Sequence, residues 1–280
     1  MTDEHNQWRG NRMTGKYKRL IYERKGKDGE VLYLTLNNEK MMNAISETMQ
    51  EELVEVMGET ARDSTIRCVV LTGAGEKVFS AGGDIRLFQT LDHVSAYDLM
   101  YQKGNILQYY MTYMEKPLIA AVNGICYAGG LELALFCDFI YCVEDATFGF
   151  PEINIGLLPG WGGTVRLPRA IAVRKAKEMI YTGEILTAKE AHQWGLVNKV
   201  LPTREALFKE VEKTVAAMMA KPPLTLRAAK NVIVNSITCD SIEAALAIER
   251  GSIMWLASSE DTREGISAFI EKRPARFKGK

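Results

Sequence analysis

The sequence predicts an α/β fold of parallel strands joined by helical crossovers, followed by a helical region that begins near residue 200. Short apolar, β-branched runs alternate with segments of helical apolar spacing in the first two thirds of the chain. Such alternation favours a parallel sheet, because each helix carries the chain back to the edge where the next strand starts. From "LPTRE" at residues 201–205 onward, only helical patterns remain. The polar residues 1–16 are expected to form a flexible tail.

The individual elements can be assigned in order along the chain. Strand patterns occupy residues 31–37, 67–73, 117–124 and 138–145. Ser46 is the predicted cap of the first helix. Helical spacing occupies residues 46–63, 93–115 and 129–138. In the C-terminal region, helices are predicted at residues 204–221, 223–237, 241–259 and 262–273.

The composition excludes several classes of protein. The chain has 280 residues with 35 basic and 35 acidic side chains, so its charge gives no reason to expect nucleic acid or an anionic membrane as a partner. There is no run of about 20 apolar residues, so no transmembrane helix is expected. The cysteines form no Cys-x-x-Cys pair, which favours buried free thiols in a reducing, cytoplasmic compartment. They are Cys68, Cys126, Cys137, Cys142 and Cys239.

Two glutamates, Glu132 and Glu152, lie among glycine and apolar residues. Burial raises the pKa of a carboxyl group, and two neighbouring carboxyls drive each other's pKa values apart, so one acid and one base can coexist at neutral pH. Gly83 and Gly129 each follow a strand pattern and precede a helical one, where backbone N–H groups have no helical partner. Two such amides brought together would form an oxyanion hole. The alternative is a helix-capping glutamate among ordinary glycine turns.

Other catalytic chemistries find little support. The chain has no G-x-S-x-G elbow, Walker A pattern, dinucleotide fingerprint or H-E-x-x-H motif. Its histidines, His5, His93 and His192, are far apart in sequence and are expected to be tail, surface or packing residues. No metal site is therefore expected.

Several segments together carry a family resemblance. They are "LNNEKMMNAIS", "VVLTGAGEKVFSAGGDIRLF", "KPLIAAVNGICYAGGLELALFCDFIYCVEDATFGFPEINIGLLPGWGGTVRLPR", "YTGEILTAKEAHQWGLVNKV" and "DTREGISAFIEKRPARFKGK". In this order they resemble the crotonase (enoyl-CoA hydratase/isomerase) superfamily over roughly residues 17–280, with motifs most similar to enoyl-CoA hydratases. The set of motifs is specific for the superfamily and much less specific for the reaction.

The resemblance implies a fold, an assembly and a substrate. Residues 17–200 would form a spiral of ββα units holding the active site, which corrects a plain parallel sheet toward a spiral. Residues 201–280 would form a helical trimerisation region that also contributes to the CoA site. The assembly would be a homotrimer or a dimer of trimers. The substrate would be an acyl-CoA thioester, with no cofactor beyond the CoA that it carries.

The resemblance also implies roles for particular residues. Gly83 and Gly129 match the oxyanion-hole donors, Glu132 and Glu152 match the catalytic glutamates, and Gly160 matches a glycine beside the catalytic water. The residues that match CoA-binding positions are Lys40, Ala81, Asp84, Ile85 and Arg86. For Lys40 and Arg86 the alternative is ordinary solvated charge.

Three aromatic residues depart from the family pattern. Trp161 stands where a small residue is usual, Phe150 where a polar one is usual, and Tyr127 where a small or aliphatic one is frequent. One interpretation is that Trp161 and Phe150 shape the pocket for a ring-bearing acyl group. The alternative for all three is core packing, which is the expected role of Tyr127.

Because both glutamates are retained, the sequence favours addition of water across the 2,3-double bond of an enoyl-CoA. The alternatives within the superfamily are hydration of a cyclic dienoyl-CoA, double-bond isomerisation and acyl-CoA hydrolysis. A non-catalytic scaffold or RNA-binding homologue is the alternative of a different class.

Overall fold

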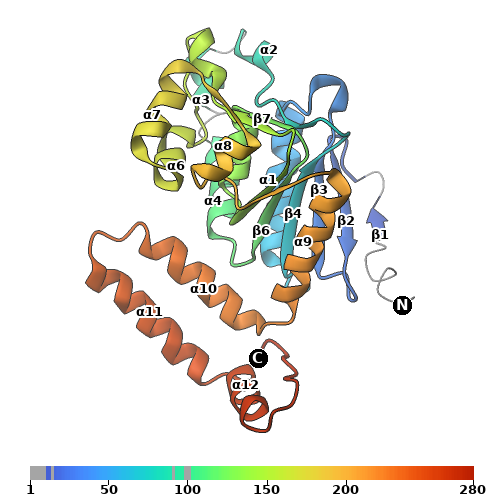
Figure 1. Ribbon diagram of the computed structural model, residues 1–280, viewed down its shortest axis with the longest axis vertical. Coiled ribbons are helices and arrows are strands. Elements are labelled where there is room, and N and C mark those ends of the chain that lie inside the picture. Colours follow the sequence, from blue (N-terminus) through green and yellow to red (C-terminus); the bar gives the residue numbers. More distant parts are fainter. Residues whose placement is uncertain (1–10, 14–15, 90–91, 98–101) are drawn as a thin grey trace.

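The structure, a computed structural model, describes residues 11–13, 16–89, 92–97 and 102–280. The expected α/β class is confirmed, with two sheets and a helical C-terminal region (Figure 1). None of the helices in these ranges combines the length and the apolar character that a membrane span needs. His5 and most of the expected tail lie outside the described residues, but Asn11–Met13 form a strand.

The larger sheet has seven strands in the order β1-β2-β3-β4-β6-β8-β11. The strands β3 to β11 pair in parallel, whereas β1, β2 and β3 pair antiparallel. The expected flexible tail is therefore corrected at β1, which pairs with β2. The bounds are β1 (Asn11–Met13), β2 (Leu20–Lys25), β3 (Val31–Leu36), β4 (Cys68–Gly73), β6 (Leu118–Val122), β8 (Phe139–Val143) and β11 (Lys199–Leu201).

A second sheet of four short strands, in the order β10-β9-β7-β5, was not predicted from the residues alone. Its strands have three residues each, which is too short for an alternating pattern to show. β5, β7 and β9 pair in parallel, so the ends of these strands bring consecutive turns to one edge. The bounds are β5 (Val78–Ser80), β7 (Ile125–Tyr127), β9 (Thr147–Gly149) and β10 (Ile185–Thr187).

Helices flank the sheets and join their strands. The predicted cap Ser46 accepts a hydrogen bond from the Met49 N–H at the start of α1. The segment predicted as one helix over residues 93–115 contains two described helices, α3 and α4. The helices up to residue 200 are η2 (Glu39–Met41), α1 (Glu47–Arg62), α2 (Ile85–Phe88), α3 (His93–Tyr97), α4 (Gly104–Tyr113), α5 (Gly129–Leu135), η4 (Pro151–Ile155), α6 (Gly163–Ala170), α7 (Val173–Thr182) and α8 (Ala188–Gln193).

The chain after β11 is helical. Its helices are α9 (Arg204–Met219), α10 (Pro223–Ser236), α11 (Ile242–Ala257) and α12 (Glu260–Ile270). Figure 1 shows α10 and α11 as a pair that extends away from the two sheets, with α12 beyond them. Large apolar side chains on this extension remain exposed, among them Met254 at 75% and Phe269 at 86%.

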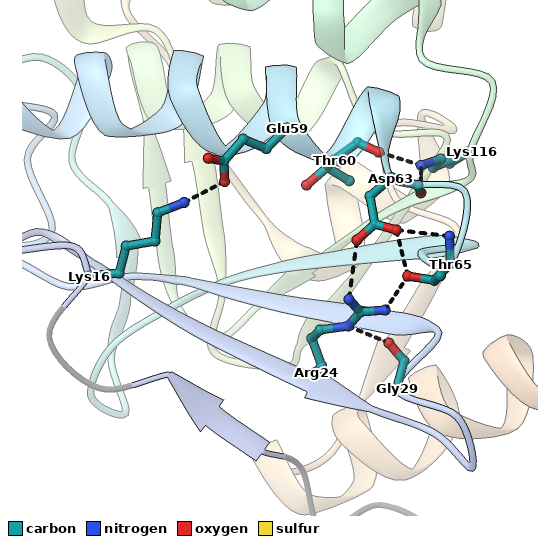
Figure 2. Close-up of polar contacts among 8 residues, drawn as sticks. All are labelled: Lys16, Arg24, Gly29, Glu59, Thr60, Asp63, Thr65 and Lys116. Atoms are coloured by element: carbon teal, nitrogen blue, oxygen red, sulfur yellow. Dashed lines mark hydrogen bonds and ion pairs between the residues drawn. The ribbon is translucent and has the colours of Figure 1, made fainter.

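A polar cluster fixes the C-terminal end of α1 to the larger sheet (Figure 2). The Lys116 ammonium, just before β6, donates to the carbonyl oxygens of Thr60 and Asp63. Burial lowers the pKa of Lys116 to about 8. From β2, Arg24 pairs with the Asp63 carboxylate at 3.1 Å and donates to Thr65 Oγ1 at 2.7 Å. The opposite, N-terminal end of α1 borders the cavity described next.

Candidate active site

A cavity of about 360 Å³ lies where turns from four parts of the fold meet. Its walls come from the start of α1, the turn from β5 into α2, the turn from β7 into α5, and η4 with the loop that follows it. The described lining residues are Ile45, Glu47, Gln50, Ala81, Gly83, Asp84, Ile85, Leu87, Ala128, Gly129, Glu132, Pro151, Glu152, Asn154, Ile155, Leu157, Leu158, Gly160 and Trp161.

The amides of Gly83 and Gly129 come together at one wall of this cavity. β5 and β7 pair in parallel, so the turns that follow the two strands are neighbours. A Cβ built on Gly129 would lie 3.5 Å from the Gly83 nitrogen. Neither N–H group has a hydrogen-bond acceptor within the part of the chain that the structure describes. Two unpaired backbone donors at one spot provide the geometry that an oxyanion needs.

Close backbone packing explains the glycines around these amides. Gly82 has φ +100°, and a Cβ there would lie 2.5 Å from the Ala128 Cβ. A Cβ on Gly130 would lie 2.5 Å from the Ser80 carbonyl oxygen. Ala128 itself has φ 51° and ψ −131°, a conformation that costs a non-glycine residue about 1–3 kcal/mol. This strained residue starts α5 and sets the direction of the Gly129 N–H.

Glu132 projects from the first turn of α5 and is 3% exposed. Its Oε1 accepts hydrogen bonds from the backbone N–H groups of Trp161 at 2.6 Å and Gly163 at 2.8 Å. Burial raises the pKa of Glu132 to about 7, against the lowering effect of these two donors, and Glu152 raises it further only when Glu152 is ionised. The carboxyl group is therefore held in place and titrates near neutrality.

Glu152 lies in η4, across the cavity lining from α5. Its Oε2 is buried and has no hydrogen-bond partner among the described residues. Burial raises the pKa of Glu152 to about 7. A buried carboxyl oxygen without a donor disfavours the ionised form, so this group is suited to carrying a proton.

The remaining predicted residues fall into two sets. Gly160 and Trp161 line the cavity, as do three of the positions matched to CoA binding, Ala81, Asp84 and Ile85. Trp161 is the single aromatic residue in the described lining.

Three predicted residues do not line the cavity. Phe150 was expected beside the pocket, but the structure instead places it in the core with no exposed surface, where it packs under Gly163. Its ring fills space behind the loop whose backbone donates to Glu132. Lys40 is exposed, and Arg86 is exposed with its guanidinium paired to Asp84 at 2.7 Å.

Sequence reasoning missed the wall contributed by the start of α1 and, in the loop after η4, Leu157 and Leu158. Ile45 lies at the cavity because its backbone is hydrogen-bonded to the turn after β5. Its N–H donates to the Gly82 carbonyl at 2.8 Å, and its carbonyl accepts from the Asp84 N–H at 3.1 Å. This link joins segments that no sequence spacing connects. Leu157 and Leu158 carry only a generic apolar signal. Tyr127 does not line the cavity, and its hydroxyl lies 2.9 Å from Thr147 Oγ1.

The described residues contain no cluster of three or more metal-ligating side chains. Among them, the cysteines are all free thiols. His192 does not line the cavity, and its Nδ1 lies 2.8 Å from the Val197 carbonyl oxygen. The side chain of His93 lies outside the part of the chain that the structure describes.

Known proteins share this arrangement of elements. A family model described as enoyl-CoA hydratase/isomerase matches residues 26–280. The chain belongs to the enoyl-CoA hydratase/isomerase family. The crystal structure of enoyl-CoA hydratase from Bacillus anthracis superposes with a TM-score of 0.85 at 35% identity, covering 90% of this chain and 96% of that one. The predicted crotonase-like fold is thereby confirmed.

Two members of the family illustrate its range of substrates. Crotonyl-CoA hydratase of Syntrophomonas wolfei is 36% identical, over 93% of this chain and 98% of its own length. The 2,3-dehydroadipyl-CoA hydratase of Escherichia coli is 40% identical, over 89% of this chain and 96% of its own length. Both relatives are named as hydratases of an acyl-CoA.

Proposed function

We propose that this protein adds water across the 2,3-double bond of an enoyl-CoA thioester. The observation that carries the proposal is the meeting, at one cavity, of two carboxyl groups with pKa values raised to about 7 and two amides without acceptors. The hydratases among its relatives support the same activity. Proton transfer is efficient when the pKa of the catalytic group lies near the working pH, which both glutamates satisfy.

The amides would activate the substrate. The thioester carbonyl oxygen would accept hydrogen bonds from the Gly83 and Gly129 N–H groups, which draws electrons from the conjugated double bond and makes C3 electrophilic. When oxygen adds to C3, negative charge moves to the carbonyl oxygen as an enolate, and the two donors stabilise it. The N-terminus of α5, which contributes one of the donors, favours that charge as well.

The two glutamates would divide the proton transfers. Glu132 already accepts two N–H hydrogen bonds, which favour its ionised form, so it takes a proton from water as the water oxygen bonds to C3. Glu152 has an oxygen without a donor, which favours its protonated form, so it gives its proton to C2 as the enolate collapses. Transfer of the proton from Glu132 back to Glu152 through solvent restores the starting state. The two groups and the two amides complete the reaction without a cofactor.

The CoA portion would bind at the mouth of the cavity. Ala81, Asp84 and Ile85 line the side formed by the turn into α2, where backbone groups can bind the pantetheine amides. Lys40 and Arg86 are exposed outside the cavity lining, and we assign them to the CoA phosphates.

We further propose that the chain forms a homotrimer or a dimer of trimers in the cytoplasm. Exposed apolar side chains on α11 and α12, such as Met254, Trp255 and Phe269, form a surface that a second copy would cover. The free thiols fit a reducing compartment. The mass in solution, measured by light scattering, tests the assembly.

The activity is tested with crotonyl-CoA and a panel of linear and cyclic enoyl-CoA thioesters. Loss of the conjugated thioester absorbance, together with a product heavier by one water, is the expected result. A product with a shifted double bond, or free CoA with the acid, would overturn the proposal in favour of isomerisation or hydrolysis. No turnover of any thioester would overturn catalysis itself.

A further inference from the structure

The lining of the cavity has an exposed side and a buried side. On the exposed side, Ile85, Ile155 and Leu158 are 62%, 58% and 64% exposed. The buried side includes Glu132, which is 3% exposed, and Trp161, which is 7% exposed. A ligand therefore enters past the aliphatic side chains, and the space open to it ends beside Glu132 and Trp161.

The backbone on both sides of the Trp161 side chain is fixed against the carboxyl group of Glu132. The N–H groups of Trp161 and Gly163 donate to Glu132 Oε1, at 2.6 and 2.8 Å. Gly162 between them has φ +101°, which glycine adopts without strain. The side chain of Trp161 therefore leaves the backbone next to the carboxyl group that takes a proton from water in the proposed reaction.

The indole of Trp161 is packed so that it offers the cavity a small apolar surface. It belongs to the main cluster of buried apolar side chains. Its Nε1 is buried and has no hydrogen-bond partner among the described residues. An acyl group that reaches the indole therefore meets carbon atoms, with no polar group to bind and too little of the ring face to stack on. This packing makes the indole a wall rather than a platform for a ring-bearing acyl group.

In the proposed hydration, the acyl group extends from the exposed side toward this wall. The thioester oxygen would lie at the Gly83 and Gly129 amides, with C2 and C3 between the two glutamates. Carbons beyond C3 would then continue toward Trp161. Additional carbons would have to displace a ring that is packed into the core, and such overpacking is costly.

We propose that Trp161 is a specificity-determining residue that stops the acyl chain, so that the enzyme hydrates short enoyl groups and rejects long or ring-bearing ones. This inference rests on the proposed function and specifies its substrate class. It also assigns a role to the single aromatic residue in the described lining.

The wild-type protein is tested with enoyl-CoA thioesters of different length and shape. They are crotonyl-CoA, trans-2-hexenoyl-CoA, trans-2-decenoyl-CoA and the ring-bearing cyclohex-1-ene-carbonyl-CoA. We expect kcat/KM to fall by about 100-fold from crotonyl-CoA to decenoyl-CoA, because the pocket cannot hold the longer chain. Equal values for these two, or the highest value for the ring-bearing thioester, would overturn the inference and leave hydration intact. Failure to hydrate any of the four would instead count against hydration itself.

Smaller apolar side chains at position 161 test whether the indole is the wall. Trp161→Leu and Trp161→Ala both keep the backbone N–H that donates to Glu132. We expect the ratio of kcat/KM for decenoyl-CoA to that for crotonyl-CoA to rise about tenfold in Trp161→Leu and further in Trp161→Ala. Leu158→Ala is the control for space added on the exposed side, and it should leave this ratio within about twofold of the wild-type value.

Circular dichroism and thermal unfolding establish that each variant is folded. If Trp161→Ala does not fold, Trp161→Leu carries the test, because leucine fills more of the space that the indole leaves. An unchanged ratio in folded Trp161→Leu, or an equal rise in Leu158→Ala, would overturn the inference. Hydration of crotonyl-CoA by the same variants would leave the proposed function standing in either case.

Discussion

The start of α5 and the 3-10 turn η4 each place one glutamate at the same cavity, under different restraints. Glu132 on α5 is held by two backbone donors from the loop leading into α6. Glu152 on η4 has a buried oxygen with no donor. Burial nevertheless raises the pKa of each to about 7. Burial thus sets where both groups titrate, and in the proposed mechanism the group with local donors accepts a proton and the group without them supplies one.

Removing each carboxylate in turn gives the largest expected effect and sharpens this comparison. We predict that Glu132→Gln lowers kcat by about 10⁴-fold and Glu152→Gln by about 10²-fold, at opposite ends of the range for general acid–base groups. The glutamine oxygen at position 132 still accepts from Trp161 and Gly163, so the fold should persist. Steady-state kinetics with crotonyl-CoA and a circular dichroism spectrum provide the check. A Glu132→Gln enzyme within tenfold of wild type would break the assignment.

Displacing α5 from β5 tests whether activity depends on where α5 holds the Gly129 N–H. A Cβ on Gly130 would lie 2.5 Å from the Ser80 carbonyl oxygen, so Gly130→Ala must displace α5 and with it the Gly129 N–H. We predict a loss of about 10² in kcat, the scale of one misplaced oxyanion donor. Gly251→Ala in α11 is the control, because a Cβ there meets open space. Similar rates for the two variants would contradict the account.

Displacing the loop whose backbone donates to Glu132 should have a smaller effect on kcat. A Cβ on Gly163 would lie 2.7 Å from Phe150 Cζ and 2.7 Å from Pro159 Cβ. Gly163→Ala should therefore cost about 1–3 kcal/mol of stability by overpacking, and should lower kcat about tenfold by shifting the donor of Glu132. Thermal unfolding and initial rates, set beside Gly251→Ala, measure both. Full activity in a destabilised Gly163→Ala enzyme would show that the donor does not matter.

The smallest expected effect is a change in how the free energy of unfolding depends on pH. The pKa of Glu152 is raised from 4.5 to about 7 on folding, so the wild type loses stability as pH rises through that window. Glu152→Gln has no group to ionise and so does not lose stability in this way. The free energy of unfolding of the variant, relative to that of the wild type, should therefore rise by about 1 kcal/mol or more between pH 5 and pH 8. Urea unfolding at several pH values measures it.

Glu264 provides a control of opposite sign for this measurement. Arg273 lowers the pKa of Glu264 to about 2, so that carboxylate stabilises the fold at neutral pH and loses the effect only as pH falls toward 2. Glu264→Gln should therefore be less stable than wild type at both pH 5 and pH 8. If the difference in free energy of unfolding between Glu152→Gln and the wild type stays constant with pH, the raised pKa of Glu152 is contradicted.

Much of the fold was predictable because long elements carry periodic patterns. β3, β4, α1 and the four C-terminal helices all follow from apolar spacing within single segments. The second sheet did not follow, since three-residue strands show no period and are stabilised by their neighbours. The strand formed by Asn11–Met13 was hidden in a polar segment that pairs at a sheet edge.

The candidate site was likewise predictable from the sequence only in part. Glycines that precede helices indicated the amides of Gly83 and Gly129, because such positions need close backbone approach. The contacts of Glu132 with the amides of Trp161 and Gly163 depend on where a distant loop folds, which no spacing specifies. Phe150 shows the limit most plainly, since this aromatic residue two positions before Glu152 lies in the core rather than in the cavity.

Infrared difference spectroscopy near pH 7 is the most direct test of the proposal that Glu132 is the base and Glu152 the acid of one proton-transfer pair. The C=O band of a protonated carboxyl group distinguishes the two forms, and Glu132→Gln and Glu152→Gln each remove one candidate. We predict that the band of the wild type disappears in Glu152→Gln and persists in Glu132→Gln. A band that persists in Glu152→Gln and disappears in Glu132→Gln would contradict the assignment.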